Sequence, residues 1–350
     1  MTAVRAAAGI EGLLTVDLGA VAANWRTLAA LHAGGAVAGV VKADGYGLGA
    51  VPVARALAAA GCRHFFVAHL AEGLALRAGL GEAPMVAVLN GFPPGADAGA
   101  GLVPVWNSLE DVAAHAGAPG ILQLDTGMAR LGVPPEAWAG LAGLRPLYVM
   151  THLACADQPA HPLNGQQARR FAEARALLPG VAGSFAASSG MFLGAGFESD
   201  LARPGAALYG VNPTPGRPNP MRPVVTLTAP VLQIRDVPAG VSVGYAASWV
   251  AARASRVATV AAGYADGYLR SLSGKALASF QGQPVPLVGR VSMDLSTFDV
   301  TDVPGLRVGD HLTLIGEGCD VDAVAARAGT IGYEVLTSLG ARYQRRYVAG

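Results

Sequence analysis

Residues 39–50 read GVVKADGYGLGA, in which Lys42 ends an apolar run and directly precedes a glycine-rich turn. The chain has only one other lysine, Lys275, in a polar Ser-Gly-Lys setting, and every other long basic side chain is an arginine. An amine can lose its proton when it is desolvated and can then attack a carbonyl, whereas a guanidinium cannot. The pattern therefore indicates a lysine kept for its chemistry, although a strand-end lysine whose tip reaches solvent would also fit.

The glycines after Lys42 allow a second interpretation. Residues 45–50 satisfy the pattern G-x-G-x-x-A of a dinucleotide-binding turn. Such a turn requires an acidic residue about 20 positions later, at the end of the next strand. The corresponding window, His64–His69, contains none, and Glu72 lies beyond it in a predicted helix. A nicotinamide-dinucleotide site is therefore less well supported, and it stays as an alternative.

Length and composition limit the class of protein. The chain has 350 residues, 52% of them hydrophobic and 14% charged, so it can bury a large core and form two domains. A net charge of +1 gives no general attraction to nucleic acid or to acidic membranes. No uninterrupted apolar stretch reaches about 20 residues, and Met1–Leu14 lacks the apolar core of a signal peptide.

Cysteine usage indicates a reducing compartment. The three cysteines, Cys62, Cys155 and Cys319, are odd in number and widely separated. Reduced thiols of a cytoplasmic protein fit this pattern better than disulfides or a zinc site. His161 follows His152 by nine positions, which is not the spacing of a helical metal pair. We therefore expect a cytoplasmic protein without a bound metal.

Short apolar runs alternate with alanine-rich helical stretches along the first two thirds of the chain. Eight such units over about 200 residues predict a (β/α)8 TIM-type barrel in residues 1–220, with an open doubly wound sheet as the alternative. The last run is the least convincing strand because it is short and polar. The runs are Val37–Lys42, His64–Ala68, Met85–Leu89, Leu102–Val105, Ile121–Asp125, Leu147–His152, Val181–Ala186 and Ser199–Arg203.

A proline-rich segment, Val211–Pro223, marks the predicted domain boundary. Beyond it, alternating runs are separated by Pro-Gly, Ala-Gly and Val-Gly-Asp turns. This pattern predicts a smaller, predominantly β C-terminal domain over residues 221–350, built as a barrel or sandwich. The runs are Val224–Val237, Ser255–Ala262, Pro284–Val291 and His311–Ile315.

Polar side chains follow the predicted barrel strands at their C-terminal ends, the face on which barrel active sites form. Ser188-Ser189-Gly190 follows the seventh run, and Arg203-Pro204-Gly205-Ala206 follows the eighth and predicts a short helix with proline in its first turn. Hydroxyls and free backbone N–H groups at these positions commonly hold a phosphate. Together with Lys42 they predict a phosphate-bearing aldehyde cofactor, pyridoxal 5'-phosphate. The charged and polar residues concerned are Lys42, Asp125, Arg130, His152 and Arg203.

The chain resembles the alanine racemase family, the barrel-type class of pyridoxal-phosphate enzymes, over nearly its whole length. The resemblance is specific because several separated motifs occur in the family's order. In the first domain they are TVDL at 15–18, VKADGYG at 41–47, DTGMAR at 125–130, THLA at 151–154, RPG at 203–205 and LYG at 208–210. In the second domain they are VGY at 243–245, GYADG at 263–267, SMD at 292–294 and TIGYE at 330–334.

The resemblance implies roles for individual residues. Lys42 would carry the cofactor, and Tyr245 of the second domain would be the opposing catalytic base. Arg203 would face the pyridine nitrogen, His152 would pack on the ring, and Arg130 would bind the cofactor phenolate and the substrate carboxylate. The residues implied at the phosphate are Tyr46, Ser188, Ser189, Gly205, Ala206 and Tyr333, and those implied along the substrate path are Tyr264, Met293 and Asp294.

These roles imply the interconversion of L- and D-alanine by two bases on opposite faces of the substrate. Because Lys42 can serve only one face, we expect a homodimer in which Tyr245 of one subunit completes the site of the other. Without its neighbours, His152 would fit a structural core histidine better than a cofactor contact. The tyrosines of the second domain would likewise fit ordinary aromatic packing.

The sequence departs from the family pattern at several positions. Gln123 stands where many members carry a lysine that becomes carbamylated, and its carbonyl could accept a hydrogen bond from Arg130 without bringing a charge. Ser188, Trp249 and Ser292 replace a common asparagine, tyrosine and cysteine. These changes leave open whether alanine or serine is the preferred substrate.

Two further functions remain as alternatives. A barrel protein that binds pyridoxal phosphate without turning over amino acids would need no opposing base, so the second domain argues against it. A decarboxylase on the same barrel would be distinguished by loss of the substrate carboxylate.

Overall fold

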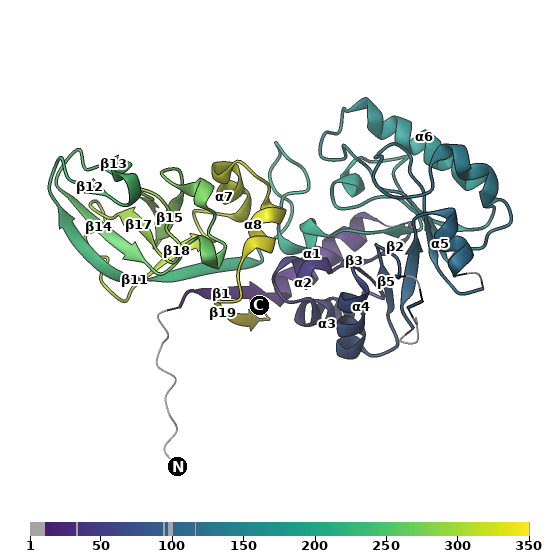
Figure 1. Ribbon diagram of the computed structural model, residues 1–350, viewed down its shortest axis with the longest axis horizontal. Coiled ribbons are helices and arrows are strands. Elements are labelled where there is room, and N and C mark those ends of the chain that lie inside the picture. The colour runs from purple at the N-terminus through teal and green to yellow at the C-terminus, as the bar shows by residue number, and fades with distance from the viewer. Residues whose placement is uncertain (1–10, 33, 94, 97–100, 116, 350) are drawn as a thin grey trace, which may run out of the picture. The chain divides into compact units, whose positions relative to one another are not determined.

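The computed structural model describes residues 11–32, 34–93, 95–96, 101–115 and 117–349, and Figure 1 labels the elements they form. The chain divides into two compact units, Leu18–Arg222 and Met1–Asp17 with Pro223–Gly350, which are described separately. Most of Met1–Leu14, for which the sequence predicts no signal peptide, lies outside the described residues.

The unit Leu18–Arg222 is built around a parallel sheet that returns to its starting point. The strand order is β2-β10-β9-β8-β7-β6-β5-β4-β3, and its two ends are the neighbouring segments β2 (Ala36–Val37) and β3 (Gly39–Val40). β2 pairs with β10 and β3 with β4, so this one stretch of chain joins the first and last strands. The remaining strands are β4 (His64–Val67), β5 (Met85–Val88), β6 (Val103–Trp106), β7 (Ile121–Gln123), β8 (Tyr148–Met150), β9 (Ala182–Ser184) and β10 (Leu201–Ala202). The predicted (β/α)8 barrel is confirmed, and the open-sheet alternative is wrong.

Helices follow most of the strands. They are α1 (Leu18–Leu31), α2 (Lys42–Tyr46), α3 (Ala50–Ala60), α4 (Leu70–Leu80), α5 (Leu109–Ala114) and α6 (Pro162–Ala176), with short 3-10 segments η1 (Pro135–Leu141), η2 (Ser189–Phe192) and η3 (Ala206–Tyr209). The strands are buried on both faces, as expected for a parallel sheet covered by helices. Between the sheet and α6, Phe171 stacks on Phe185 with ring centroids 5.0 Å apart.

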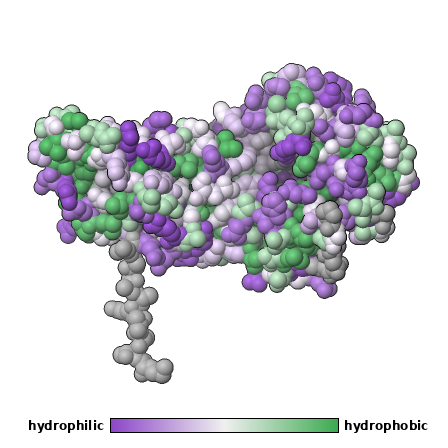
Figure 2. Space-filling model, in the orientation of Figure 1, coloured by the Kyte–Doolittle hydropathy of each residue, from purple (hydrophilic) through white to green (hydrophobic). Residues whose placement is uncertain are grey.

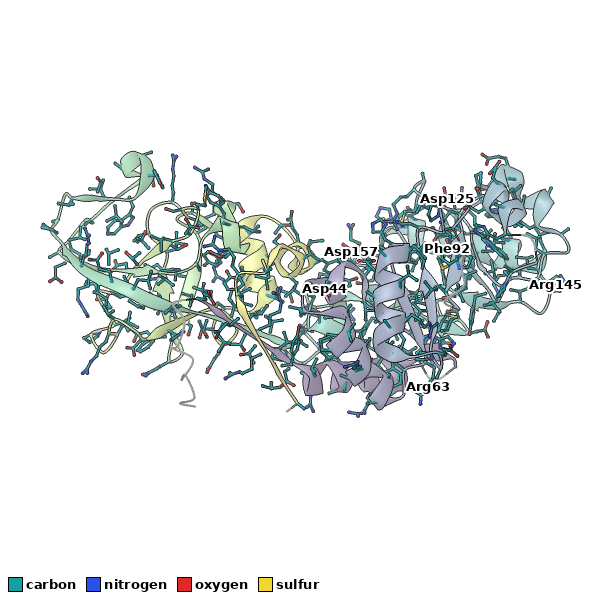
Figure 3. All side chains as sticks on the ribbon, turned by 60° about the horizontal axis from the view of Figure 1, so that its bottom comes forward. Asp44, Arg63, Phe92, Asp125, Arg145 and Asp157 are labelled. Carbon is teal, nitrogen blue, oxygen red and sulfur yellow. The ribbon has the colours of Figure 1, made fainter. Side chains whose placement is uncertain are left out.

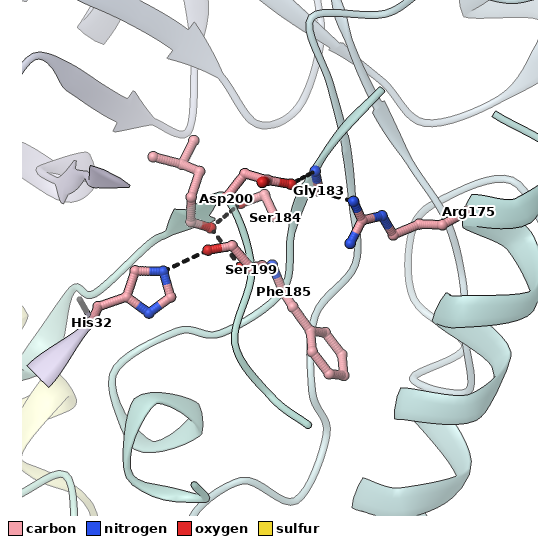
Figure 4. Close-up of polar contacts among 8 residues, drawn as sticks. His32, Arg175, Gly183, Ser184, Phe185, Ser199 and Asp200 are labelled. Atoms are coloured by element: carbon pink, nitrogen blue, oxygen red, sulfur yellow. Dashed lines mark hydrogen bonds and ion pairs between the residues drawn. The ribbon is translucent and has the colours of Figure 1, made fainter. Parts of the chain in front are cut away.

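The two-residue strand β10 is held by side chains as well as by its ladder (Figure 4). Ser184 Oγ donates to the carbonyl of Leu201 at 2.7 Å. The Asp200 carboxylate accepts from the backbone N–H of Gly183 at 2.6 Å and pairs with Arg175 at 3.3 Å. These contacts explain why a short, polar run still forms the eighth strand, because its polar side chains bond to β9 and its surroundings even where they are partly exposed.

The other unit is predominantly β. Its longest strand, β11 (Val225–Val237), pairs with β1, β14 and β18. The further elements are β12 (Ser242–Val243), β13 (Trp249–Val250), β14 (Ser255–Val260), β15 (Leu277–Phe280), β16 (Gln283–Pro286), β17 (Ser296–Asp299), β18 (His311–Ile315) and β19 (Gln344–Val348). The 3-10 segments η4 (Tyr245–Ala247), η5 (Tyr264–Asp266) and η6 (Arg270–Leu272) and the helices α7 (Val321–Ala328) and α8 (Gly332–Ser338) complete it.

The N-terminal strand departs from the predicted boundaries of 1–220 and 221–350. β1 (Leu13–Asp17) pairs antiparallel with β11 and parallel with β19, so it belongs to the β unit and not to the barrel. Leu14 and Val16 alternate with more exposed neighbours and are fully buried. Alternation specifies a half-buried strand but not which sheet it joins.

Two observations concern the distribution of hydrophobic residues, one along the helices and one on the surface. Across the described ranges, no helix is both long enough and apolar enough to cross a membrane. Hydrophobic and hydrophilic residues are interspersed on the face drawn in Figure 2.

Candidate active site

Lys42 begins a turn of unusual backbone conformation at the C-terminal end of β3. Ala43, Asp44 and Tyr46 have φ values of 53°, 52° and 56°, in the left-handed region that non-glycine residues rarely adopt. The Asp44 carboxylate, marked in Figure 3, accepts from the N–H of Ala50 at 2.8 Å, where α3 begins. The turn therefore directs the chain from the strand into the helix while it presents Lys42 and Tyr46.

The amine of Lys42 lies in a desolvating, cationic environment. Burial lowers the pKa of Lys42, and the nearby Arg130 lowers it further, whereas Glu72 acts in the opposite direction. Desolvation and a second cation both disfavour the protonated amine. Lys275 is exposed in the β unit, so only Lys42 has the setting of a reactive amine.

Arg203 is buried at the end of β10, with 5% of its surface exposed. It donates from Nη1 to Ser184 Oγ and from Nη2 to the carbonyl of Thr151, both at 2.5 Å. Burial lowers the pKa of Arg203 to about 10, which still leaves it protonated near neutral pH. Since a guanidinium offers only donors, this side chain can hold an acceptor but cannot supply a removable proton.

His152 lies among these cations at the end of β8. Burial, followed by the charges of Arg203, Arg130 and Lys42, lowers the pKa of His152 to about 3. Its backbone carbonyl accepts from Gln167 Nε2 at 2.9 Å, which fixes the loop that carries it. The structure thus brings together Lys42, Arg130, His152 and Arg203, four of the five residues that the sequence predicted at the barrel's C-terminal face, with the imidazole kept neutral.

The loop that carries Arg130 is organised by Asp125. Its Oδ1 accepts from the N–H groups of Gly127, Met128 and Ala129, at 2.9, 3.0 and 3.1 Å. Arg130 follows directly and is exposed. An aspartate that binds three successive N–H groups fixes the backbone and leaves the arginine side chain available for a ligand.

Gln123 bonds to a different partner from the one that the sequence suggested, which was Arg130. It is buried, and its Nε2 donates to the carbonyl of Leu131 at 3.1 Å. No hydrogen bond between Gln123 and Arg130 occurs among the residues that the structure describes. The glutamine therefore supports the segment next to Arg130 instead of contacting the guanidinium.

The predicted phosphate residues of the barrel meet around Gly205. Ser188 Oγ accepts from the N–H groups of Gly205 and Ala207, at 3.1 and 3.2 Å. A Cβ at Gly205 would lie 2.2 Å from the hydroxyl of Tyr46, so only glycine leaves this space free. Tyr46 is in turn packed on Tyr209 with ring centroids 4.6 Å apart.

This cradle has the donors that a phosphate needs. Ser189 begins η2, and Ala206 begins η3 immediately after Gly205. Pro204 precedes that short helix instead of lying in its first turn. Hydroxyls and backbone N–H groups converging beside a cationic cluster fit a phosphate-bearing group, with Lys42 as the amine for its aldehyde.

The β unit carries the remaining predicted residues. Tyr245 is 67% exposed and follows Gly244, whose φ is 78°. Backbone bonds join the segments of Tyr264 and Met293: the N–H of Tyr264 donates to the Ser292 carbonyl at 3.0 Å and that of Ala265 donates to the Met293 carbonyl at 2.9 Å.

Arg342 fixes the same two segments. It pairs with Asp294 at 2.7 Å and with the buried Asp266 at 3.0 Å. The structure therefore groups Tyr264, Met293 and Asp294. Tyr333 lies in α8 of this unit.

Sequence reasoning missed several residues that support the site. Glu72 contacts the turn after Lys42, Ser184 holds Arg203, and Arg342 holds Asp294. Glu72 could have been found from its position three residues after His69, where it forms a capping box at the start of α4. Ser184 and Arg342 carry no local signal, because their partners lie 19 and 48 residues away.

Comparisons with known proteins agree with this geometry. Two family models match, alanine racemase N-terminal domain over residues 16–213 and alanine racemase C-terminal domain over residues 224–347. The alanine racemase of Acidiphilium cryptum is 55% identical over 349 residues, which cover 95% of this chain and 97% of that protein. A catabolic alanine racemase of Mesorhizobium japonicum is 50% identical, covering 99% of this chain and 95% of its own.

Solved structures show the same similarity. The alanine racemase from Bartonella henselae, which contains covalently bound pyridoxal phosphate, has a TM-score of 0.92 and 41% identity, covering 97% of this chain and 99% of its own. The biosynthetic alanine racemase from Pseudomonas aeruginosa has a TM-score of 0.88 and 36% identity, with the same coverage of both chains.

Proposed function

The chain belongs to the alanine racemase family, and we propose that Lys42 carries pyridoxal 5'-phosphate while Tyr245 acts as the second catalytic base. Enzymes of this family interconvert L- and D-alanine with this cofactor, and this chain is an enzyme of that class. The observation that carries the assignment of residues is the electrostatic grouping of Lys42, Arg130, His152 and Arg203 at one end of the barrel.

The chemistry of the residues present fits the cofactor. Its phosphate would lie in the cradle of Ser188, Ser189, Gly205 and Ala206 with the hydroxyl of Tyr46, and Tyr333 would add a further hydroxyl. Arg203 would donate to the ring nitrogen, and His152 would pack on the ring as a neutral imidazole. When bound, pyridoxal phosphate withdraws electrons from the α-carbon of an attached amino acid and makes its proton acidic.

The chain's own residues then have to move that proton. The lowered pKa of Lys42 favours the neutral amine, whose Nζ can accept a proton from one face of the substrate. A base on the opposite face must supply a proton for the configuration to invert, and we assign this role to the hydroxyl of Tyr245. Its exposure in the β unit leaves that hydroxyl available to a substrate.

Residues of both units are assigned to the substrate. Arg130 would bind the carboxylate through its exposed guanidinium, which offers two parallel donors. Tyr264, Met293 and Asp294 would line the path of the amino acid, with Arg342 holding Asp294 in place. We further propose a cytoplasmic homodimer that shares its sites, since all three cysteines are free and the second base is exposed on the β unit.

The assignment of Lys42 is tested by chemical trapping. Borohydride treatment of the purified holoenzyme should fix a pyridoxyl group to Lys42, located by peptide mass spectrometry. Lys275 is the internal control, and Lys275→Arg should trap the cofactor normally. Lys42→Arg keeps the charge but should trap none, because a guanidinium cannot take the place of the amine. A pyridoxyl group found on Lys275 would refute the assignment.

The reaction is tested in deuterium oxide with L-alanine. Loss of optical rotation and gain of α-deuterium should proceed together, with the carboxylate retained. L-Serine in the same assay measures the substrate preference. Deuterium incorporation with full retention of configuration would exclude a second base.

A further inference from the structure

We propose that Glu72 is a positioning residue for Lys42. The carboxylate of Glu72 joins the left-handed turn that begins beside Lys42 to the end of strand β4. This inference rests on the proposed role of Lys42. Glu72 lies in helix α4 and is assigned no role in the cofactor or substrate contacts above.

The turn needs external support because its conformation is costly. Ala43, Asp44 and Tyr46 all have positive φ, a left-handed conformation in which the Cβ of a non-glycine residue is crowded by its own backbone. Within the turn, the N–H of Gly45 bonds to the Val41 carbonyl at 2.9 Å and that of Gly47 bonds to the Ala43 carbonyl at 2.8 Å. The N–H of Ala43, the first strained residue, finds its partner outside the turn.

Glu72 supplies that partner. Its Oε1 accepts from the N–H of Ala43 at 2.7 Å, and its Oε2 accepts from the N–H groups of Ala68 and His69 at 2.7 and 3.0 Å. Ala68 and His69 directly follow β4, the strand that pairs with β3. The last backbone link between the two chain segments is the N–H of Val41 to the Phe66 carbonyl at 2.9 Å. Lys42 therefore lies between two links to the β4 segment: the backbone bond of Val41 on one side and the Glu72 contact of Ala43 on the other.

The position of the turn matters at both of its ends. Lys42 stands at the start, and Tyr46 stands at the end with its hydroxyl against Gly205 in the phosphate cradle. A shift of the turn would displace the amine and this hydroxyl together. Fixing Ala43 to the end of β4 thus holds both groups in place relative to the barrel.

Glu72 also contributes a charge. Of the charged groups that act on Lys42, Arg130 from the loop after β7 lowers its pKa and Glu72 from α4 raises it. His152 from β8 faces the same amine and is neutral, because its own pKa is lowered to about 3. Removing the carboxylate should therefore lower the pKa of Lys42 further.

A matched control separates this role from simple helix capping. Asp111 occupies the equivalent third position of α5, where its Oδ2 accepts from the Asn107 N–H at 2.8 Å. Ser108 Oγ completes that cap by accepting from the Asp111 N–H at 3.1 Å. Asp111→Asn therefore perturbs a barrel helix cap that makes no recorded contact with the described Lys42 turn.

The test uses full-length Glu72→Gln, in which one carboxylate oxygen becomes an NH2 group that cannot accept. The amide oxygen can keep the cap of α4, but the link to Ala43 is lost. The dissociation constant of pyridoxal phosphate should rise at least about tenfold, because this is the change in affinity that corresponds to the free energy of one lost hydrogen bond to a charged group. Its dissociation constant is measured by equilibrium dialysis.

The second readout is the pH profile of Lys42 itself. Competitive acetylation of the cofactor-free chain, quantified by mass spectrometry, gives the protonation midpoint of Lys42 with Lys275 as internal reference. Glu72→Gln should shift the Lys42 midpoint to lower pH and leave Lys275 unchanged. Asp111→Asn should change neither the midpoint nor the affinity.

Glu72→Asp covers the case in which Glu72→Gln folds poorly. It keeps the charge but is one methylene shorter, so it should lose affinity while its Lys42 midpoint stays near that of the wild type. Wild-type affinity in both Glu72 variants, or an equal loss in Asp111→Asn, would overturn the proposal. Failure of the proposed function would appear differently, as no pyridoxyl group on Lys42 in the wild-type chain.

Discussion

Arg203 donates from Nη1 to the Oγ of Ser184 at 2.5 Å, and the Ser184 hydroxyl in turn donates to the carbonyl of Leu201 at 2.7 Å. One hydroxyl thus joins the buried guanidinium to the strand that precedes it. The other arm of Arg203 is held by the Thr151 carbonyl. The orientation of Arg203 is therefore set by strands β8, β9 and β10 together and not by its own loop.

Ser184→Ala should loosen this arrangement. The guanidinium loses one of two recorded partners inside the barrel, at a cost of about 1–3 kcal/mol in unfolding free energy for a hydrogen bond to a charged group. Because Arg203 is assigned to the cofactor ring, affinity for pyridoxal phosphate should fall as well. Urea unfolding and equilibrium dialysis measure the two effects.

Ser296→Ala is the matched control for Ser184→Ala. Ser296 is as buried and donates to the carbonyl of Ala262 at 2.7 Å, but it lies in the β unit. It should destabilise that unit without changing cofactor affinity. Equal affinity losses in the two variants would show that Ser184 has no special relation to Arg203.

The depressed pKa of His152 predicts a pH dependence of stability. The folded pKa is about 3, against about 6.5 in an unfolded chain, so the unfolded state binds the extra proton between these values. Unfolding free energy should then decrease as the pH falls from about 6.5 toward 3, by up to about 1.4 kcal/mol per pH unit for one proton. The lowered pKa of His64, caused by burial, acts with the same sign.

Comparison with His152→Asn isolates this contribution. The variant should show a shallower loss of stability between pH 6.5 and pH 4.5 in urea unfolding. The His152 Cε1–H resonance, assigned by its absence in the variant, should not titrate over the same range. Equal slopes in both proteins would contradict the lowered pKa.

Gln123→Leu tests the support of the Arg130 segment. The substitution removes the hydrogen bond to the Leu131 carbonyl and leaves that carbonyl without its recorded partner. The KM for alanine should rise more than kcat falls, since Arg130 is assigned to the substrate carboxylate. Added bicarbonate should not change the wild-type rate, because a glutamine cannot be carbamylated. An unchanged KM would mean that Gln123 serves only the core.

Mixing two inactive variants tests the shared site. Lys42→Ala and Tyr245→Phe each remove one proposed base. If Tyr245 acts across the dimer, a mixed dimer has one site with both lesions and one with neither. Activity should then recover toward half the wild-type value per mixed dimer. Confirmed subunit exchange without recovery would place Tyr245 in its own subunit's site or outside the reaction.

Local pattern was sufficient for the barrel, and it singled out Lys42 as a candidate. Each of the eight predicted runs of the first domain contains a strand. For the apolar runs the reason is that an apolar run bounded by turn residues specifies a buried strand wherever it lies, whereas the polar run Ser199–Arg203 forms β10 through its pairing and side-chain contacts. Chain order then specifies the parallel neighbours, since each βα unit places the next strand beside the last. The scarcity of lysine drew attention to Lys42 without any structure, and its role with the cofactor stays a proposal.

Only the tertiary structure decided which distant groups meet. β1 joins the β unit because its partners, β11 and β19, come from the far end of the chain. The sequence showed only that Glu72 lies too far along the chain to complete a dinucleotide-binding motif. In the structure its carboxylate accepts a hydrogen bond from the N–H of Ala43, 29 residues earlier. The pKa of His152 likewise depends on Arg203, Arg130 and Lys42, which barrel closure brings to one place. Sequence patterns record which face of a segment is buried, whereas hydrogen bonds and charge interactions depend on distances that exist only after the chain has closed on itself.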